Sequence, residues 1–90
     1  MKINIEHSPQ FDKNYKKRIG QNKKLVKVFI QRTELFIEKP NHPLLKDHQL
    51  IGNKNSFRSF SLGGDLRIIY FKVDDSHVIF FDIGSHNQVY

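Results

Sequence analysis

Two histidines, His48 and His86, stand at the ends of extended segments, where side chains can converge over the edge of a sheet. Metal-free RNA cleavage needs a base for the 2′-hydroxyl proton, cations for the phosphorane and an acid for the leaving 5′-oxygen. Histidine titrates near neutral pH and suits either proton role. Arg58 and Arg67 suit the phosphorane, and Tyr90 can stack on a base or donate a proton. These residue types allow RNA cleavage, although their spacing alone does not require it.

Other chemistries have less support in the sequence. The chain has five histidines and no cysteine, with no HExxH motif and no histidine pair at i, i+4 on a predicted helix. His7 and His77 lie near turns and His42 precedes a proline in a loop, contexts that explain them structurally. A zinc site assembled from distant loops is the minor alternative. We expect neither a metal nor another cofactor.

The positive charge is concentrated in the N-terminal half of the chain. Residues 1–40 carry ten Lys/Arg and four Asp/Glu, whereas residues 41–90 carry five of each. The excess lies between residues 13 and 27, where no acid interrupts Lys13, Lys16, Lys17, Arg18, Lys23, Lys24 and Lys27. Such a block either binds a polyanion, nucleic acid or an acidic protein, or forms a solvated helix face.

No segment of the sequence is typical of membrane insertion or secretion. The longest apolar runs fall far short of the roughly 20 residues that span a bilayer. The N-terminus lacks the apolar core of a signal peptide, and the absence of cysteine fits a reducing compartment. We therefore expect a cytoplasmic protein without a membrane partner.

The N-terminal half is predicted to form a strand and two helices. Residues 2–6 alternate apolar and polar side chains, the pattern of a short strand. Ser8 begins a helix whose apolar stripe stops at Gly20, and a second helix runs from a cap at Asn22 to about Lys39. The two helices should form a hairpin with its basic residues facing outward.

The C-terminal half is predicted to form an antiparallel sheet. After a loop over residues 40–55, with a short extended piece at 48–51, three strands are expected, at Phe57 to Leu62, Leu66 to Val73 and His77 to Ile83. The sequence therefore predicts one α+β domain over residues 1–90, with a small antiparallel sheet of about four or five strands packed against the helical hairpin.

The first hairpin of this sheet predicts which side chains share a face. A two-residue turn at Gly63-Gly64 places Phe60 opposite Arg67 and Arg58 opposite Ile69. Arg58, Phe60 and Arg67 would then lie on one face and suit phosphate clamping and base stacking. The alternative is that the arginines only solvate an open face of the sheet.

Three segments resemble one family of bacterial proteins. The runs HPLLKDHQLIG, FRSFSLGGDLRIIY and FFDIGSHNQVY, together with the basic opening FDKNYKKRI, are similar to the RelE/ParE superfamily of type II toxins. The YafQ-like branch, ribosome-dependent endonucleases that cut mRNA in the A site without a metal, is the nearest in pattern. The resemblance implies the family fold, a small antiparallel sheet backed by an N-terminal helical hairpin.

The resemblance also implies roles for individual residues. The histidine of the GxHxxxY/F tail, a leading general acid or base, falls on His86, and the closing aromatic falls on Tyr90. The histidine of HxLxG falls on His48, the acid before the long strand on Asp65, and the phosphate-holding strand arginine on Arg67. These five residues are the expected catalytic set.

The expected RNA contacts and the departures from the family follow from the same comparison. Arg58 takes a position where relatives carry a basic residue, and Phe60 is expected to contact RNA beside it. Six lysines would bind ribosomal RNA: Lys13, Lys16, Lys17, Lys23, Lys24 and Lys27. Several YafQ-like relatives carry another histidine where this chain has Phe60 and Ser61, and the RelE-type arginine of the C-terminal segment is missing.

The resemblance predicts partners and leaves two alternatives. A toxin of this kind requires a cognate antitoxin, acidic at the contact, besides the ribosome and mRNA. Operator DNA would be bound only by the toxin–antitoxin complex. The alternatives to the nuclease are a ParE-like inhibitor of DNA gyrase and a non-catalytic domain that binds RNA or an antitoxin.

Overall fold

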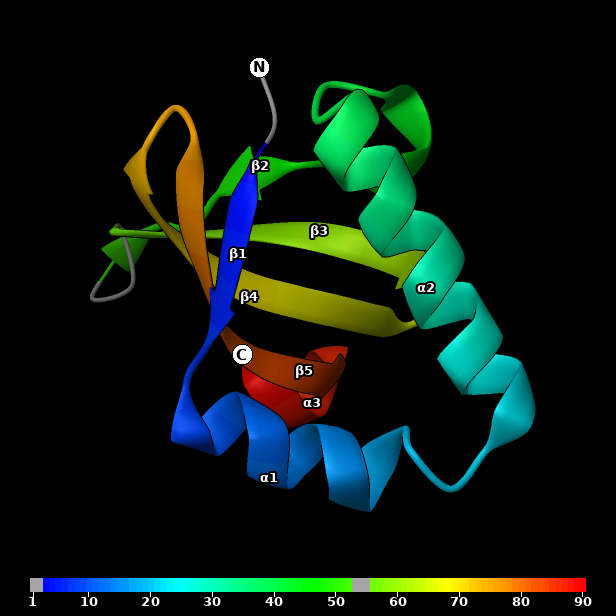
Figure 1. Ribbon diagram of the computed structural model, residues 1–90. Helices are drawn as coiled ribbons and strands as arrows, with labels where there is room; N and C mark the ends of the chain where they lie inside the picture. Colours follow the sequence, from blue (N-terminus) through cyan, green and yellow to red (C-terminus); the bar gives the residue numbers. More distant parts are fainter. Residues whose placement is uncertain (1–2, 53–55) are drawn as a thin grey trace.

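The computed structural model describes residues 3–52 and 56–90 and combines one mixed sheet with two long helices (Figure 1). In chain order the elements are β1 (Asn4–His7), α1 (Pro9–Arg18), α2 (Lys23–Glu38), a 3-10 helix η1 (Pro43–Leu45), β2 (His48–Gln49), β3 (Phe57–Gly63), β4 (Leu66–Asp74), β5 (His77–Ser85) and α3 (His86–Val89). The predicted α+β class is confirmed. Residue 2 of the first predicted strand and residues 53–55 of the predicted loop lie outside the described residues.

Both long helices begin where the sequence predicts, because each has a side-chain cap. Ser8 Oγ accepts the Phe11 amide at 3.0 Å. Asn22 Oδ1 accepts the amides of Lys24 and Leu25 at 3.0 and 3.2 Å. These bonds satisfy amide groups that have no partner within the first helical turn. No helix in the described ranges is long and apolar enough to cross a membrane.

The strands form one sheet in the order β1-β5-β4-β3-β2. From β5 to β2 the neighbours are antiparallel, as predicted, whereas β1 pairs parallel with β5 and makes the sheet mixed. β1 pairs only with the first half of β5, over residues 77–80. α1 packs against β5 and lies below it in Figure 1. The second half of β5, which β1 does not reach, therefore has α1 as its neighbour.

The register of the β3–β4 hairpin differs by one residue from the predicted register. Ser61, rather than Phe60, lies opposite Arg67, because the turn falls one residue later and a bulge interrupts the pairing between Ser61 and Gly63. A shift of one residue moves every side chain of a strand to the opposite face. Arg58 and Arg67 therefore lie on opposite faces of the sheet, and their predicted shared face is wrong.

The two faces of the sheet have different partners. On one, here called the core face, α1 and α2 bury a cluster rich in phenylalanine, in which the rings of Phe36 and Phe60 stack with centroids 4.5 Å apart. On the other, here called the α3 face, Val89 packs against Leu50 and Ile69 in a second, smaller cluster. α3 covers only part of its face, so the α3 face is where functional side chains can reach solvent.

Candidate functional site

The site is built around the reversal of the chain between β5 and α3. The Ser85 amide donates to Gln88 Oε1 at 2.7 Å, which closes the first turn of α3. Gly84 stands where this turn meets α1, and a Cβ on it would lie 2.6 Å from Gln88 Oε1 and 2.8 Å from Arg18 Nη1. Any larger residue here would displace the ends of both side chains, so glycine keeps them in place where α3 folds back over the sheet.

α3 brings the two C-terminal candidates, His86 and Tyr90, together. Their rings contact edge to face, with centroids 4.4 Å apart and an interplanar angle of 90°. The Tyr90 hydroxyl donates to Ser59 Oγ on β3 at 2.6 Å. The His86 amide donates to the Asp65 carbonyl at 3.0 Å, next to the β3–β4 turn. His86 is thus anchored to the hairpin through its backbone and to Tyr90 through its ring, while its side chain remains exposed.

His48 reaches the same face from the opposite side of β3. It is the register partner of Ser59 across the β2–β3 ladder, so both side chains point to the α3 face. His48 Nδ1 lies 2.9 Å from the Lys46 carbonyl oxygen. Since a carbonyl can only accept, the neutral ring carries its proton on Nδ1 and leaves Nε2 as an acceptor. Ser59 therefore lies between His48, its neighbour across the ladder, and Tyr90, its hydrogen-bond partner.

Arg67 supplies the positive charge on this face. Its Nη1 donates to Ser61 Oγ at 3.2 Å and to the carbonyls of Gly64 and Leu66, both at 3.0 Å. These bonds hold the guanidinium at the hairpin end of the site, where Gly84 is its register partner on β5. Asp65 follows Gly64 in the turn and its side chain is exposed. All five predicted catalytic residues thus lie on or beside the α3 face.

Two predicted RNA contacts do not belong to this face. Phe60 is 0% exposed in the core, so the prediction that it contacts RNA is wrong. Arg58 lies on the core face, where its guanidinium forms an ion pair with Asp47 at 2.9 Å. Tyr70 donates to the same carboxylate, and burial, followed by the bond to Asp47, raises the pKa of Tyr70 above its usual range. Arg58 is thus half-exposed in a structural cluster and does not form a clamp with Arg67.

The six predicted RNA-binding lysines form a separate surface. All are exposed, from the middle of α1 to the first half of α2: Lys13, Lys16, Lys17, Lys23, Lys24 and Lys27. Arg18, from the same run of charges, instead donates to the Ile83 carbonyl at 2.9 Å and lies 3.5 Å from Asp82. The charge block therefore divides into an exposed lysine surface and one anchoring arginine.

Sequence reasoning missed the polar residues that support the site. Ser59 and Ser61 are buried, 0% and 5% exposed, yet bind Tyr90 and Arg67. Asp82 is 7% exposed and accepts bonds from three side chains of α1, those of Gln10, Asn14 and Arg18. The i, i+4, i+8 spacing of these three was the available signal, since it places them in one row on a helix. Among the described residues, no three His, Asp or Glu side chains gather to hold a metal ion.

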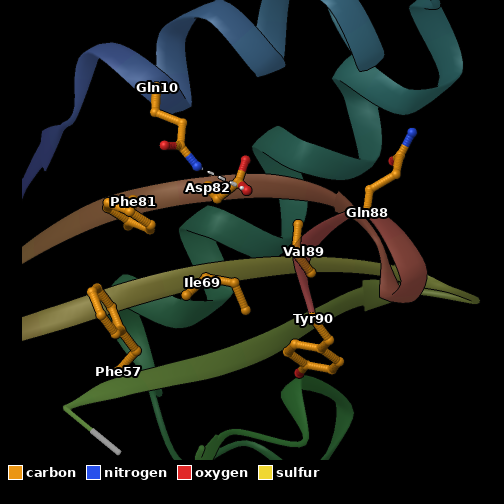
Figure 2. Close-up of a pocket in the computed structure, with 8 residues that line it drawn as sticks. All are labelled: Gln10, Phe57, Ile69, Phe81, Asp82, Gln88, Val89 and Tyr90. Atoms are coloured by element: carbon orange, nitrogen blue, oxygen red, sulfur yellow. Dashed lines mark hydrogen bonds between the residues drawn. The ribbon is translucent and has the colours of Figure 1, made fainter. Parts of the chain in front are cut away.

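A pocket of about 250 Å³ opens on the α3 face beside Tyr90 (Figure 2). Its lining residues come from α1, α3 and three strands: Gln10, Phe57, Ile69, Phe81, Asp82, Gln88, Val89 and Tyr90. Tyr90 therefore belongs to both features: its ring contacts His86, and it also lines the pocket. This pocket is the concave part of the site.

Structural comparison places the chain among small bacterial toxins. It matches YafQ from E. coli strain BL21(DE3) with a TM-score of 0.78 at 25% identity, covering 98% of each chain. The E. coli DinJ–YafQ toxin–antitoxin complex matches with a TM-score of 0.77 at 25% identity, covering 100% of this chain and 99% of the other. The YoeB dimer from Staphylococcus aureus matches with 0.74 at 27% identity, covering 96% and 99%.

Sequence comparison identifies the family. A search of curated proteins found no match. The family model described as the bacterial toxin of type II toxin-antitoxin system, YafQ, matches residues 3–90. The chain belongs to this YafQ toxin family, which confirms the resemblance inferred from its motifs.

Proposed function

We propose that this toxin is a ribosome-dependent, metal-free endonuclease that cleaves mRNA in the A site and thereby stops translation. The observation that carries the proposal is the row of neighbouring residues from His48 through Ser59 and Tyr90 to His86, with Arg67 on the same face. This row brings two imidazoles, a phenol and a guanidinium to one exposed surface. These are the groups that 2′-hydroxyl transesterification requires.

Each residue has a role that follows from its contacts. His48, with Nε2 as its acceptor nitrogen, takes the 2′-hydroxyl proton as the oxygen attacks phosphorus. Arg67 stabilises the charge on the phosphorane, and His86 protonates the leaving 5′-oxygen. The products are a 2′,3′-cyclic phosphate and a 5′-hydroxyl end. Tyr90 orients the His86 ring, and Asp65, whose carbonyl accepts the His86 amide, anchors the start of α3 to the adjacent turn.

The partners follow from the family and from the charge distribution. YafQ and YoeB have been solved with the antitoxins DinJ and YefM, and we propose that an antitoxin likewise neutralises this chain. An acidic contact region would complement the net charge of +6. The exposed lysines of α1 and α2 would bind ribosomal RNA in the cytoplasm. The complex with the antitoxin, rather than the toxin alone, would bind operator DNA.

Primer extension on a translated message tests this function. Purified protein is added to a cell-free translation reaction, and ribosome-free RNA serves as the control. We expect cuts within A-site codons only when ribosomes are present, and a loss of about 10²- to 10⁴-fold in rate for His86→Ala. His77→Gln, which changes a histidine paired with Glu6 at the other end of β5, is the matched control and should retain full activity. An intact message beside arrested translation would contradict the proposal.

A further inference from the structure

The pocket of Figure 2 has an aromatic wall on the solvent side of the sheet. Phe57 and Phe81 face each other there, with ring centroids 4.9 Å apart. Phe71 lies next to this wall, outside the lining of the pocket, with its ring centroid 6.0 Å from that of Phe57. Phe71 and Phe81 are each 37% exposed, unlike the fully buried phenylalanines of the core face. Three phenylalanines thus meet on the solvent side of the sheet.

Strand alternation and a bulge in β5 together place Phe81 and Asp82 on the α3 face. Ile69 pairs with Asp82 and Tyr70 pairs with Phe80, so Phe81 has no opposite residue on β4. An extra residue in one strand bends it and redirects a side chain, a feature common beside functional sites. Phe80 lies in the core, so its neighbour Phe81 points to the α3 face, and the bulge adds Asp82, which pairs with Ile69, to the same face.

The remaining walls of the pocket combine apolar and polar groups. Ile69 forms the floor, and Val89 and Tyr90 close the side opposite the phenylalanines (Figure 2). At the rim, Gln10 Nε2 donates to Asp82 Oδ2 at 3.2 Å. Because Asp82 holds the amide nitrogen, Gln10 is left with Oε1 as an acceptor for a ligand. The pocket thus offers flat aromatic surfaces below an acceptor oxygen.

This chemistry fits one nucleobase. At about 250 Å³ the pocket is smaller than the sites of about 300–1,000 Å³ that enclose drug-sized ligands, so it suits a single planar group. Single-stranded nucleic acids bind proteins by stacking bases on aromatic side chains. An acceptor at the rim favours bases with an exocyclic amine, which adenine, cytosine and guanine have and uracil lacks.

We propose that this pocket binds the nucleobase next to the cleaved phosphate and selects against uracil there. The proposal rests on the nuclease function and adds a base-binding subsite to it. Tyr90 separates the pocket from His86, so a phosphate at His86 has a base within reach of the pocket. Ile69, which lines the pocket, lies two positions after Arg67 on the same face of β4, a span of about 7 Å, which keeps Arg67 within reach of a phosphate whose base occupies the pocket.

An antitoxin side chain is the rival occupant. An amphipathic helix docks into an elongated groove through several anchors, whereas this pocket admits one ring. Its position beside the proposed catalytic groups also favours the nucleic acid. Fluorescence quenching and mRNA cleavage measured on the same variants separate these two occupants.

The test uses ribosomes that carry mRNA with 2-aminopurine, a fluorescent base that is quenched on stacking, at each A-site position in turn. A 2′-O-methyl codon prevents cleavage in the binding measurement. We expect wild-type protein to quench the probe at one codon position and Phe81→Ser to lose this quenching. In cleavage of the natural codon, Phe81→Ser should need about 10- to 100-fold more protein for half-saturation, and Phe81→Tyr should restore binding. A uracil at the quenched position should weaken binding of the wild type.

One control variant and three contrary outcomes decide between the subsite and its alternatives. Val73→Ser changes another exposed apolar residue of β4, beyond Phe71, and should behave as wild type. Wild-type protein that neither cuts nor quenches would overturn the nuclease function and this subsite together. Wild-type protein that cuts without quenching at any position would overturn the subsite alone. Unchanged cleavage by Phe81→Ser with weakened neutralisation by the antitoxin would assign the pocket to the antitoxin instead.

Discussion

The hydroxyl of Tyr90 donates a 2.6 Å hydrogen bond to Ser59 Oγ, joining the last residue of the chain to the middle of β3. Ser59 is fully buried, so the bond fixes the C-terminus against a rigid strand. α3 is only one turn long and has little stability of its own. The position of His86 therefore depends on contacts made at the far end of α3.

Removing this bond should loosen the C-terminus while leaving the His86–Tyr90 ring contact possible. Tyr90→Phe and Ser59→Ala should each lower the free energy of unfolding by about 1 kcal/mol, and together they should cost little more than either alone. Chemical denaturation of both single variants and the double variant measures this coupling. Fully additive losses would show that the two groups act independently.

Asp82 should be a main electrostatic anchor between α1 and the sheet. Its carboxylate is nearly buried and binds Asn14 at 2.7 Å, Gln10 at 3.2 Å and Arg18 at 3.5 Å. Asp82→Ala removes the partner of several half-buried donors, and we expect a loss of about 1–3 kcal/mol in unfolding free energy. Asp12→Ala is the matched control, because Asp12 is exposed and should contribute at most about 1 kcal/mol. Similar losses for the two variants would contradict this role for Asp82.

Tyr70 should make the protein less stable at alkaline pH. Burial raises its pKa in the folded state, so above pH about 10 the unfolded chain releases the phenolic proton while the folded protein retains it. The folded state then binds more protons, and the free energy of unfolding falls as pH rises. Denaturation between pH 8 and pH 11 should show a steeper decline for wild type than for Tyr70→Phe. Parallel curves would indicate that Tyr70 ionises equally in both states.

The lysine surface should determine the salt dependence of ribosome binding. Neutralising Lys16, Lys17, Lys23 and Lys24 together removes four charges that would release counterions from RNA. The slope of log affinity against log salt should fall by up to about 3 for four lost phosphate contacts. Sedimentation with ribosomes at several salt concentrations measures the slope, with Lys39→Gln, at the other end of α2, as the single-charge control. An unchanged slope would locate the ribosome contact elsewhere.

The sequence determined the elements, the family and most of the candidate site. The caps at Ser8 and Asn22 located both helices because their signals are local, lying within three residues of the groups they bind. The tail motif located His86 and Tyr90, and alternation of apolar residues located the strands. These features depend on near neighbours in the chain, which sequence patterns record directly.

Only the tertiary structure decided which side chains share a face. The bulge near Gly63 shifted the register by one residue, which buried Phe60 and separated Arg58 from Arg67. A second bulge, in β5, placed Asp82 beside Phe81 on the α3 face, where both line the proposed base pocket. Bulges arise where turn geometry, twist and packing across several strands are satisfied together, so no local pattern predicts them. The residue types specified the possible chemistry, and packing decided which of them meet.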